Sequence, residues 1–500
     1  MNALLKRVSD WMDPDRALQR LMGSLIDACQ AKSSLGLQRE KWRPGRPLKL
    51  LLAGYSGARN TGADVRVEEM IRQFRSILTD ENLEMTLMTV NPAKTAGYFR
   101  AVRQVKIPMV YPKFLFEECP KHHGVIACEG SMFKSKFASA LSTMMAGALG
   151  LATAEGKLSV GYGAEAGEMD GGLRDFVEKY CARSFVLCRN EASRKILDDL
   201  GIRNTGGTDT AWTFEPAPRA RGAELLRKAG WDGKRKVLIV CPINPFWWPI
   251  RPDLAKALAW RFLGEYKKEH HQSIYFHAAS ETSERKYHRY LNALAGAMNA
   301  FSREKNLFPV LVGMEELDRR ACEDLNALLT RPAPLFVSDE YDMYELVSVL
   351  RQASYLASSR YHAVVTTMPA QVPSLGITMD ERLRNLLVDR GHPDLLLTVD
   401  QEDLEEKLLS LFRKLDRENE RIADDLGRFI PPQLKLMGEM GIGLVREIER
   451  VYPEFPRRKV PESWEHFLPS LSPTVEGLLK RYESCSGGEP PLIRKMGGKR

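Results

Sequence analysis

Short apolar runs that end in glycine-rich or polar turns and lead into helical runs recur along this chain of 500 residues. Residues 48–54 form the first such run, and a turn separates them from residues 65–78, whose apolar side chains recur with helical spacing. The same order begins again at residues 236–242. Alternating strands and helices predict parallel sheets that helices cover on both faces. We therefore expect an α/β protein with two Rossmann-like, doubly wound domains that face each other across a cleft.

The predicted domain boundaries follow changes in composition along the chain. Residues 216–235 are rich in Pro, Arg, Gly and Lys and are interpreted as a linker and an entry helix. An amphipathic helix at residues 15–31 is expected either to dock on the first domain or to lie on a membrane surface. The charged helical run after residue 400 is expected to break at Pro431 and Pro432. The predicted segments are an N-terminal helical extension (1–46), an N-terminal Rossmann-like domain (47–220), a C-terminal Rossmann-like domain (221–415), a C-terminal helical segment (416–483) and a disordered tail (484–500).

Charge and cysteine usage narrow the classes of function. The chain has 73 Lys and Arg against 65 Asp and Glu, and a net charge of +8 suits an anionic small substrate or an anionic membrane surface. No basic block or RNA-binding signature predicts a nucleic-acid partner. The eight cysteines show neither a C-x-x-C pair nor zinc spacing, which predicts buried, reduced thiols and no metal site. Residues 137–154 are interpreted as a small-residue helix inside the protein, and with no secretory signal in view the chain is expected to be cytoplasmic.

The most informative stretch is residues 355–378, which predict a strand, a polar turn, a short helix and a second strand. In such a unit the turn lies at the carboxyl end of a buried strand, where open α/β sheets bind their ligands. The turn offers Ser358 and Ser359 as hydroxyls, Arg360 as a fixed cation and His362 as a group that titrates near neutral pH. The alternative interpretation is structural: Arg360 binds loop carbonyls and His362 packs beneath the strand.

The turn after residues 48–54 is a second candidate site. Gly54, Gly57 and Gly62 allow tight turns, Asn60 or Thr61 can cap the following helix, and Arg59 adds charge, so the turn could hold an anion. It is neither a dinucleotide fingerprint nor a P-loop, and an ordinary strand-to-helix turn is the alternative.

Four further residues follow other strand-like runs. Gly130 and Ser131 come after residues 124–128, and Arg189 comes after residues 184–188. Arg189 could grip an anion or form an ion pair with Glu191. His277 lies in the strand-like run 273–278.

These motifs resemble those of the polysaccharide pyruvyl transferase family. The run Ser-x-Arg-x-His-Ala followed by Val-Pro-x-x-Gly-Ile, residues 358–377, is similar to the family's hallmark. The first turn resembles Gly-x-x-Asn-x-Gly-Asp-Glu, and Arg189 with Ser193 resembles Arg-Asp-x-x-Ser. The resemblance covers roughly residues 48–397 and implies a GT-B-like arrangement. Four positions depart from the family pattern: Ala63, Glu129, Asn190 and Ser354.

The resemblance implies a reaction and roles for the matching residues. Phosphoenolpyruvate would be the donor and a sugar diol of a glycan or glycan precursor, which can be lipid-linked, the acceptor, giving a cyclic pyruvate ketal and phosphate. Such an enzyme is expected to need no cofactor and no metal, and to serve exopolysaccharide or cell-envelope synthesis in a bacterial cytoplasm or at the inner membrane face. His362 would be the general acid, and Arg360 and Arg189 would hold the anionic groups. The expected substrate-binding residues are Gly57, Arg59, Asn60, Gly62, Gly130, Ser131, His277 and Ser359.

Two other functions stay open. A GT-B glycosyltransferase or nucleotide-sugar enzyme would use the same cleft but would need a ribose-binding carboxylate, for which Glu340 or Asp342 could serve. A catalytically inactive binding protein on the same fold is the second alternative, and the four departures from the family pattern keep it open. The sequence predicts no oligomeric state.

Overall fold

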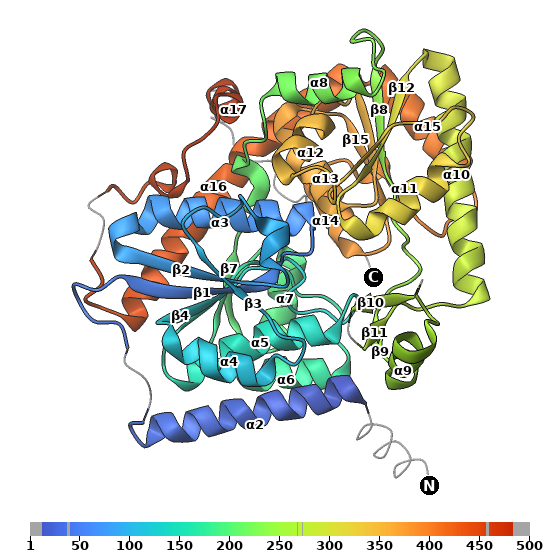
Figure 1. The fold of residues 1–500 in the computed structure, drawn as a ribbon. Coiled ribbons are helices and arrows are strands. Elements are labelled where there is room, and N and C mark those ends of the chain that lie inside the picture. Colours follow the sequence, from blue (N-terminus) through green and yellow to red (C-terminus); the bar gives the residue numbers. More distant parts are fainter. Residues whose placement is uncertain (1–12, 38–40, 268, 273, 457–459, 484–500) are drawn as a thin grey trace, which may run out of the picture.

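The computed structural model of this protein describes residues 13–37, 41–267, 269–272, 274–456 and 460–483. The chain folds into two α/β domains, each built on a parallel sheet (Figure 1). The first sheet has the order β3-β2-β1-β4-β5-β6-β7, so the strand order reverses between β1 and β4. Its strands are β1 (Leu48–Ser56), β2 (Leu83–Thr89), β3 (Arg103–Lys106), β4 (Gly124–Ala127), β5 (Leu158–Ala164), β6 (Phe185–Cys188) and β7 (Arg203–Gly206).

Helices cover both faces of the first sheet. They are α2 (Pro14–Ser34), α3 (Thr61–Leu78), α4 (Pro112–Glu118), α5 (Ser139–Ala154), α6 (Gly171–Cys181) and α7 (Glu191–Asp199). One of them, α2, forms an outer layer on the helices of one face. The small-residue helix α5 is buried almost throughout, as predicted from its composition. Helix α2 lies across α5 and α6 and buries Met22, Ile26 and Cys29 against them. Of the two alternatives for this helix, docking on the first domain is therefore the one observed.

The second sheet has the order β13-β12-β8-β14-β15-β16 and reverses between β8 and β14. Its strands are β8 (Val237–Cys241), β12 (Phe308–Gly313), β13 (Leu335–Val337), β14 (Tyr355–Ser358), β15 (Ser374–Thr378) and β16 (Leu396–Thr398). Its helices are α8 (Arg219–Lys228), α10 (Glu281–Lys305), α11 (Arg319–Asn326), α12 (Met343–Leu350), α13 (Tyr361–Thr367), α14 (Glu381–Asp389) and α15 (Leu404–Arg417). Two doubly wound parallel sheets confirm the predicted fold class. Because α8 packs on α12, the predicted boundary at residue 220 falls inside a helix of the second domain.

A small insertion separates β8 from α10. It consists of β9 (Arg251–Pro252), α9 (Leu254–Leu263), β10 (His270–Gln272) and β11 (Tyr275–Phe276), and its three strands form an antiparallel sheet of their own. The strand predicted at residues 273–278 therefore belongs to this insertion and not to a central sheet. His277 follows β11 and therefore lies in the insertion, not in a parallel sheet.

Helix α16 (Asn419–Val451) runs from the second domain to the first. Near its start the carbonyl of Ala423 accepts a hydrogen bond of 2.8 Å from Nε2 of Gln371, and farther along the carbonyl of Met437 accepts one of 2.8 Å from Nε2 of Gln73. The helix continues through Pro431 and Pro432, so the predicted break was wrong. Packing on both sides of the prolines holds the helix where local propensity alone would end it. Helix α17 (Pro473–Glu483) packs against α16.

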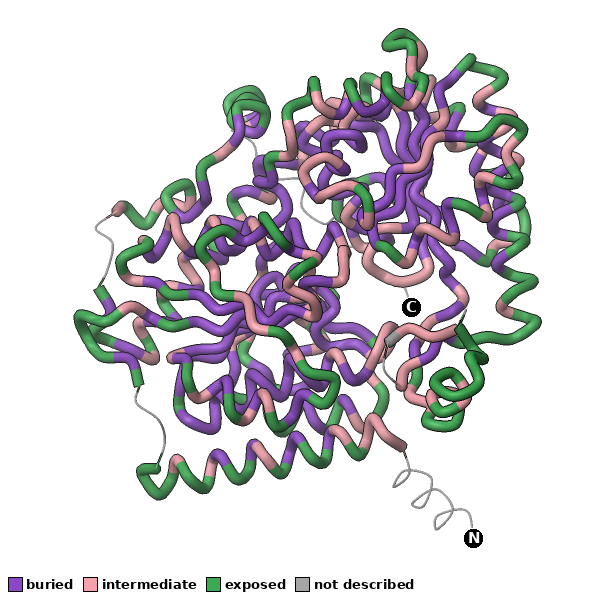
Figure 2. Tube along the Cα trace, in the orientation of Figure 1, coloured by how far each residue is buried: buried purple, intermediate pink, exposed green. Residues whose placement is uncertain are grey.

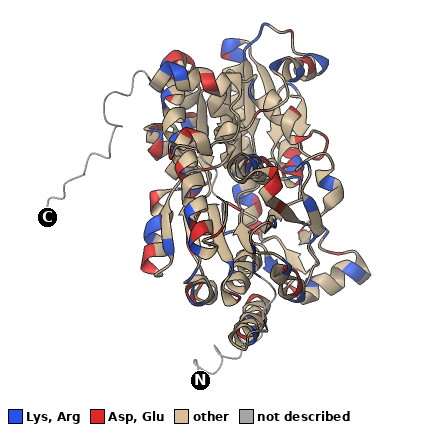
Figure 3. Ribbon diagram, turned by 90° about the vertical axis from the view of Figure 1, so that its left-hand side faces the viewer, with Lys and Arg blue, Asp and Glu red and all other residues tan. Residues whose placement is uncertain are grey.

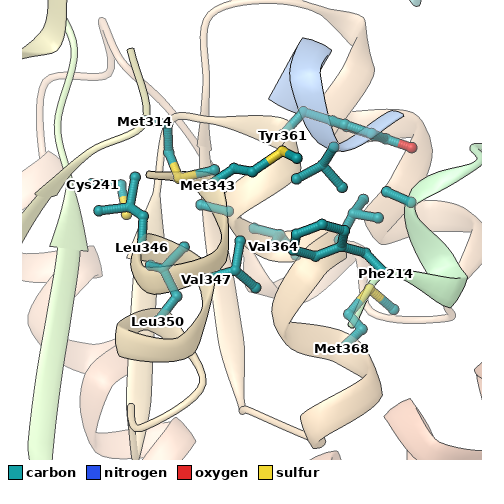
Figure 4. Close-up of a cluster of buried hydrophobic side chains, with 14 of the residues drawn as sticks. Phe214, Cys241, Met314, Met343, Leu346, Val347, Leu350, Tyr361, Val364 and Met368 are labelled. Carbon is teal, nitrogen blue, oxygen red and sulfur yellow. The ribbon is translucent and has the colours of Figure 1, made fainter. Parts of the chain in front are cut away.

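The buried residues follow the two sheets and the helix faces that cover them (Figure 2). Figure 4 shows one such cluster, in which Met343 and Leu346 of α12 lie beside Tyr361 and Val364 of α13. Basic and acidic residues are interspersed along the helices of both domains (Figure 3). The seven cysteines of the described residues are free and buried, as expected, while Cys485 lies outside them. Within the described ranges, no helix is long and apolar enough to cross a bilayer.

Candidate active site

A cavity of about 210 Å³ lies between the two domains, at the carboxyl ends of the strands beside both reversal points. Its polar wall comes from both domains and contains Tyr55, Asn60, Glu129, Ser131, Lys134, Glu315, Arg360 and Arg382. Its apolar wall includes Ile107, Pro108, Met109, Leu141, Met144, Trp248 and Ile250. The cavity continues into an outer hollow of about 750 Å³ that reaches Gly57, Lys94 and Lys106. Diverging loops on either side of a reversal point leave this crevice open.

Arg360 lies in the cavity wall, where the turn after β14 places it. The hydroxyl of Ser358 accepts a hydrogen bond of 2.9 Å from the Arg360 backbone N–H and fixes the turn. The guanidinium binds two carboxylates: Nε donates to Oδ2 of Asp318 at 2.9 Å, and Nη2 contacts Oε2 of Glu315 at 2.9 Å as well as Oδ1 of Asp318. The partners of Arg360 are therefore carboxylates, where the structural alternative expected loop carbonyls.

Glu315 is the more weakly held of these two acids. Burial raises the pKa of Glu315 to about 7, against the lowering effect of Arg360. The Glu315 carboxyl therefore changes its charge near neutral pH. When it is protonated, its ion pair with Arg360 is lost, and that part of the guanidinium becomes free.

His362 faces the first domain rather than the cavity. Its Nε2 atom lies 3.4 Å from Oδ2 of Asp209, and its ring fills the space above Gly62, where a Cβ atom would come within 2.2 Å of Nδ1. Burial lowers the pKa of His362, against the raising effect of Asp209. Gly62 is thus required by the close approach of the two domains at this histidine.

Asp209 is the centre of a buried group of charges. Its Oδ2 atom lies 3.2 Å from Nε of Arg66 and 3.1 Å from Nη1 of Arg189. Burial acts to raise the pKa of Asp209, but Arg66, His362 and Arg189 together hold it well below its usual range. Arg189 also forms an ion pair with Glu165 and stacks on the ring of Tyr361 at 4.3 Å. It therefore lies behind the cavity, and its partners are these residues and not the nearby Glu191.

Lys134 connects this group of charges to the cavity. Its Nζ atom lies 3.0 Å from Oε1 of Glu165 in the first domain and 2.7 Å from Oε1 of Glu381 in the second. Burial lowers the pKa of Lys134 to about 8. Sequence analysis did not single out Lys134, because a lysine three residues beyond a Gly-Ser turn carries no distinctive spacing.

Glu129 brings a carboxylate to the end of β4, where it lines the cavity. Its Oε1 atom accepts a hydrogen bond of 2.8 Å from the N–H of Gly130. Its Oε2 atom is buried and has no hydrogen-bond partner among the described residues. A buried carboxylate oxygen without a partner is costly, which makes Glu129 a candidate for a functional role.

The remaining predicted site residues are dispersed. Asn60 caps α3 and lines the cavity. Ser131 also lines the cavity, and Gly57 borders the outer hollow. Gly130 lies against Arg66 and Arg189 behind the cavity. The others make contacts elsewhere: Arg59 with the hydroxyl of Tyr98, Ser359 with the hydroxyl of Tyr290, and His277 with the ring of Trp247. In the part of the chain that the structure describes, no three His, Cys, Asp or Glu side chains are grouped to hold a metal ion.

Comparison with known proteins gives a family and several structures. Residues 145–381 match the model of the family described as polysaccharide pyruvyl transferase. HepE of Anabaena, solved in complex with UDP-glucose, shares 10% identity over 81% of this chain and 98% of its own, with a TM-score of 0.48. The UDP-GlcNAc 2-epimerase of Neisseria meningitidis, bound to UDP-GlcNAc, shares 10% identity over 76% of this chain and 94% of its own, with a TM-score of 0.47. No curated protein sequence matches the chain.

Proposed function

We propose that the protein transfers the pyruvyl group of phosphoenolpyruvate to a sugar diol of a glycan or glycan precursor, because residues 145–381 match the model of the polysaccharide pyruvyl transferase family. The observation that carries the proposal is the position of the family's Ser-x-Arg-x-His segment: it forms the turn after β14 and sets Arg360 in the wall of the interdomain cavity. A cation at the reversal point of a doubly wound sheet is well placed to bind an anionic donor.

The chemistry balances without a redox partner or a metal. The methylene carbon of the donor takes a proton and becomes a methyl group, and the first sugar hydroxyl adds to the neighbouring carbon. The second hydroxyl then replaces the phosphate at the same carbon, so the bond between that carbon and the phosphate oxygen breaks. One hydroxyl proton restores the proton donor and the other leaves with the phosphate. The site must therefore supply cations for the phosphate and carboxylate, and one group that gives and takes a proton.

Arg360 and Lys134 are the cations that we assign to the donor. Both line the cavity, and both are held by carboxylates in the described structure. An incoming phosphate or carboxylate would replace Glu315 at Arg360, which is easiest when Glu315 is protonated. Arg189, behind the cavity, acts in this proposal on the position of Tyr361 and Asp209 rather than on the donor.

We assign the proton transfer to Glu129. The sequence-based hypothesis gave this role to His362, but that ring packs between Gly62 and Asp209 outside the cavity wall. Glu129 lines the cavity and presents an oxygen that has no described protein partner. His362 then serves as a positioning residue that joins the two domains. The departure from the family pattern at residue 129 supplies, on this proposal, the acid that the reaction needs.

The proposed acceptor is a sugar diol, and the cavity wall that would surround it is partly apolar. Trp248 and Tyr55 lie in the cavity wall, where an aromatic side chain can pack against a sugar. We place the reaction in a bacterial cytoplasm, and at the inner membrane face where the acceptor is lipid-linked, in exopolysaccharide or cell-envelope synthesis.

Thermal-shift and isothermal titration measurements with phosphoenolpyruvate, UDP-glucose and UDP-GlcNAc test the proposal. Phosphoenolpyruvate is expected to stabilise the wild type and to bind Arg360→Ala and Arg360→Lys much more weakly, because lysine lacks the bidentate fork. The exposed Arg285→Ala serves as control, and circular dichroism checks that each variant is folded. Stabilisation by a nucleotide sugar alone would contradict pyruvyl transfer in favour of glycosyl transfer. If none of the three ligands binds or stabilises the protein, the result would favour the inactive binding protein.

A further inference from the structure

Helix α9 of the insertion turns its large apolar side chains outward. None of its ten residues is buried. Leu254, Leu258 and Phe262 are 61%, 59% and 75% exposed, and their spacing of four residues puts them on one face of the helix. Leu263 beside them is 71% exposed. We name these four side chains the α9 surface. A helix of a soluble domain normally buries such a stripe, so the α9 surface indicates an external apolar partner.

The orientation of α9 is fixed by contacts on its other side. Trp260 stacks on the ring of His270, with 4.0 Å between the ring centres. Lys256 forms an ion pair with Glu269 of the same insertion. At the start of the helix, the Asp253 side chain accepts a hydrogen bond of 2.9 Å from the N–H of Lys256. Because one side of α9 is held against the insertion, the α9 surface on the other side stays turned to solvent.

The charges around the α9 surface are mainly basic. Residues 251–267 contain four Lys and Arg against two Asp and Glu. Arg251, Arg261 and Lys267 are exposed, and of the two acids Asp253 is engaged as the helix cap. An apolar helix face bordered by basic side chains has the composition of a helix that lies in the interface of an anionic bilayer.

The insertion that carries the α9 surface also forms part of the cavity wall. Trp248, His271 and Tyr275 of this region line the cavity. On the opposite domain, Met109 lines the same cavity and is 68% exposed, and its neighbour Val110 is 70% exposed. Exposed apolar side chains thus lie on the insertion and on the loop of the opposite domain, and both of these segments line the cavity.

We propose that the α9 surface inserts into the headgroup region of an anionic membrane and holds the opening of the cleft at the bilayer surface. The interaction is peripheral and involves no spanning helix. A second copy of the chain is less favoured as the partner, because a symmetric contact through this face would bring the Arg261 and Lys267 side chains of two copies together. The proposal goes beyond pyruvyl transfer and holds whatever the reaction is.

Co-sedimentation of the full chain with vesicles tests it directly. Vesicles of phosphatidylcholine are compared with vesicles that also contain phosphatidylglycerol. The wild type is expected to bind the anionic vesicles more strongly than the neutral ones. The double variant Leu258→Glu/Phe262→Glu is expected to lose at least about tenfold in partitioning, since two large apolar side chains leave the membrane. The double variant Arg261→Glu/Lys267→Glu is expected to lose the preference for anionic vesicles.

The matched control is Val388→Glu, which changes another exposed apolar side chain, 53% exposed, on α14 of the second domain. It is expected to bind vesicles like the wild type. Absence of wild-type binding to both vesicle types overturns the proposal, and so does an equal loss in the control. Sedimentation velocity without lipid provides the third outcome: a dimer that Leu258→Glu/Phe262→Glu dissociates would assign the α9 surface to a second copy instead. None of these readouts depends on phosphoenolpyruvate, so failure here and failure of the proposed reaction are distinguishable.

Discussion

The Nε2 atom of His362 lies 3.4 Å from Oδ2 of Asp209, and this contact joins the two domains. His362 stands in the helix that follows β14 of the second sheet, while Asp209 follows β7 of the first. The same carboxylate binds Arg66 and Arg189. His362 is thus tied to the charge group behind the cavity, with its partner some 150 residues earlier in the chain.

Replacing Asp209 by Asn should destabilise the protein strongly. The change leaves Arg66 and Arg189 buried with one counter-charge fewer, and breaking a buried ion pair in this way costs about 3–5 kcal/mol. Urea unfolding followed by circular dichroism measures the loss. The control Asp27→Asn, at an ion pair with Lys179 on the surface, should leave the free energy of unfolding nearly unchanged. Equal effects of the two changes would contradict the central place given to Asp209.

Adding a methyl group at Gly62 should push against the His362 ring. Gly62→Ala is expected to lose about 1–3 kcal/mol of unfolding free energy, the usual cost of overpacking. In a His362→Ala background the same change should cost much less, because the clash is gone. Gly171→Ala, where a Cβ atom meets no neighbour within 4 Å, is the matched control. Additive losses in the double variant would refute the contact.

Binding of phosphoenolpyruvate should strengthen as the pH falls through about 7. Deprotonated Glu315 competes for Arg360, and its pKa of about 7 means that protonation removes this competitor. In Glu315→Gln the dependence should flatten, with tighter binding at pH 8 than in the wild type. Since the phosphate of the donor also titrates, wild type and variant are compared at each pH by isothermal titration. The neighbouring exposed Glu316→Gln should retain the wild-type profile.

Stability should fall as the pH rises toward 8 because of Asp64. Burial raises the pKa of this carboxyl to about 8, against the lowering effect of the Gly57 N–H. Its contribution is therefore fully present below its ordinary pKa near 3.8 and is lost as the pH approaches 8, with a slope of up to about 1.4 kcal/mol per pH unit. Asp64→Asn should show a flatter profile in thermal unfolding between pH 5 and 9. If the stability of Asp64→Asn depends on pH in the same way as that of the wild type and of the exposed control Asp80→Asn, the raised pKa of Asp64 is contradicted.

Glu129→Gln should impair turnover while leaving the binding of the donor intact. Loss of a general acid–base group lowers kcat by about 10²–10⁴-fold. Phosphate release with a sugar diol acceptor gives kcat, and thermal shift with phosphoenolpyruvate gives binding. If kcat is unchanged in this variant, or if the binding of phosphoenolpyruvate falls together with kcat, Glu129 is not the proton-transfer residue.

The position of Arg360 was predictable from local sequence, but its partners were not. An apolar strand that ends in a polar turn places its residues at the carboxyl edge of a sheet, and β14 and α13 obey this rule. Asp318 lies 42 residues earlier and Glu315 farther still, after β12, which β8 separates from β14 in the sheet. No sequence spacing encodes such a contact, because strand order in the sheet differs from strand order in the chain.

His362 and Lys134 show the same limit across domains. The strand and helix around each were predictable, yet what each side chain touches depends on how the two sheets face each other. Glu129 entered the sequence analysis as a departure from the family pattern, and only the cavity wall gives it a candidate role. The α9 surface escaped prediction because an outward apolar stripe has the same periodicity as a buried one.

Helix α16 links the two domains through 33 continuous residues, a length of roughly 50 Å. Pro431 and Pro432 lie between the part that bonds to the second domain and the part that bonds to the first. They cannot donate to the carbonyls of residues 427 and 428, so the helix resists bending least at that point. The proline pair therefore places the most easily bent point of α16 between its contacts with the second domain and its contacts with the first.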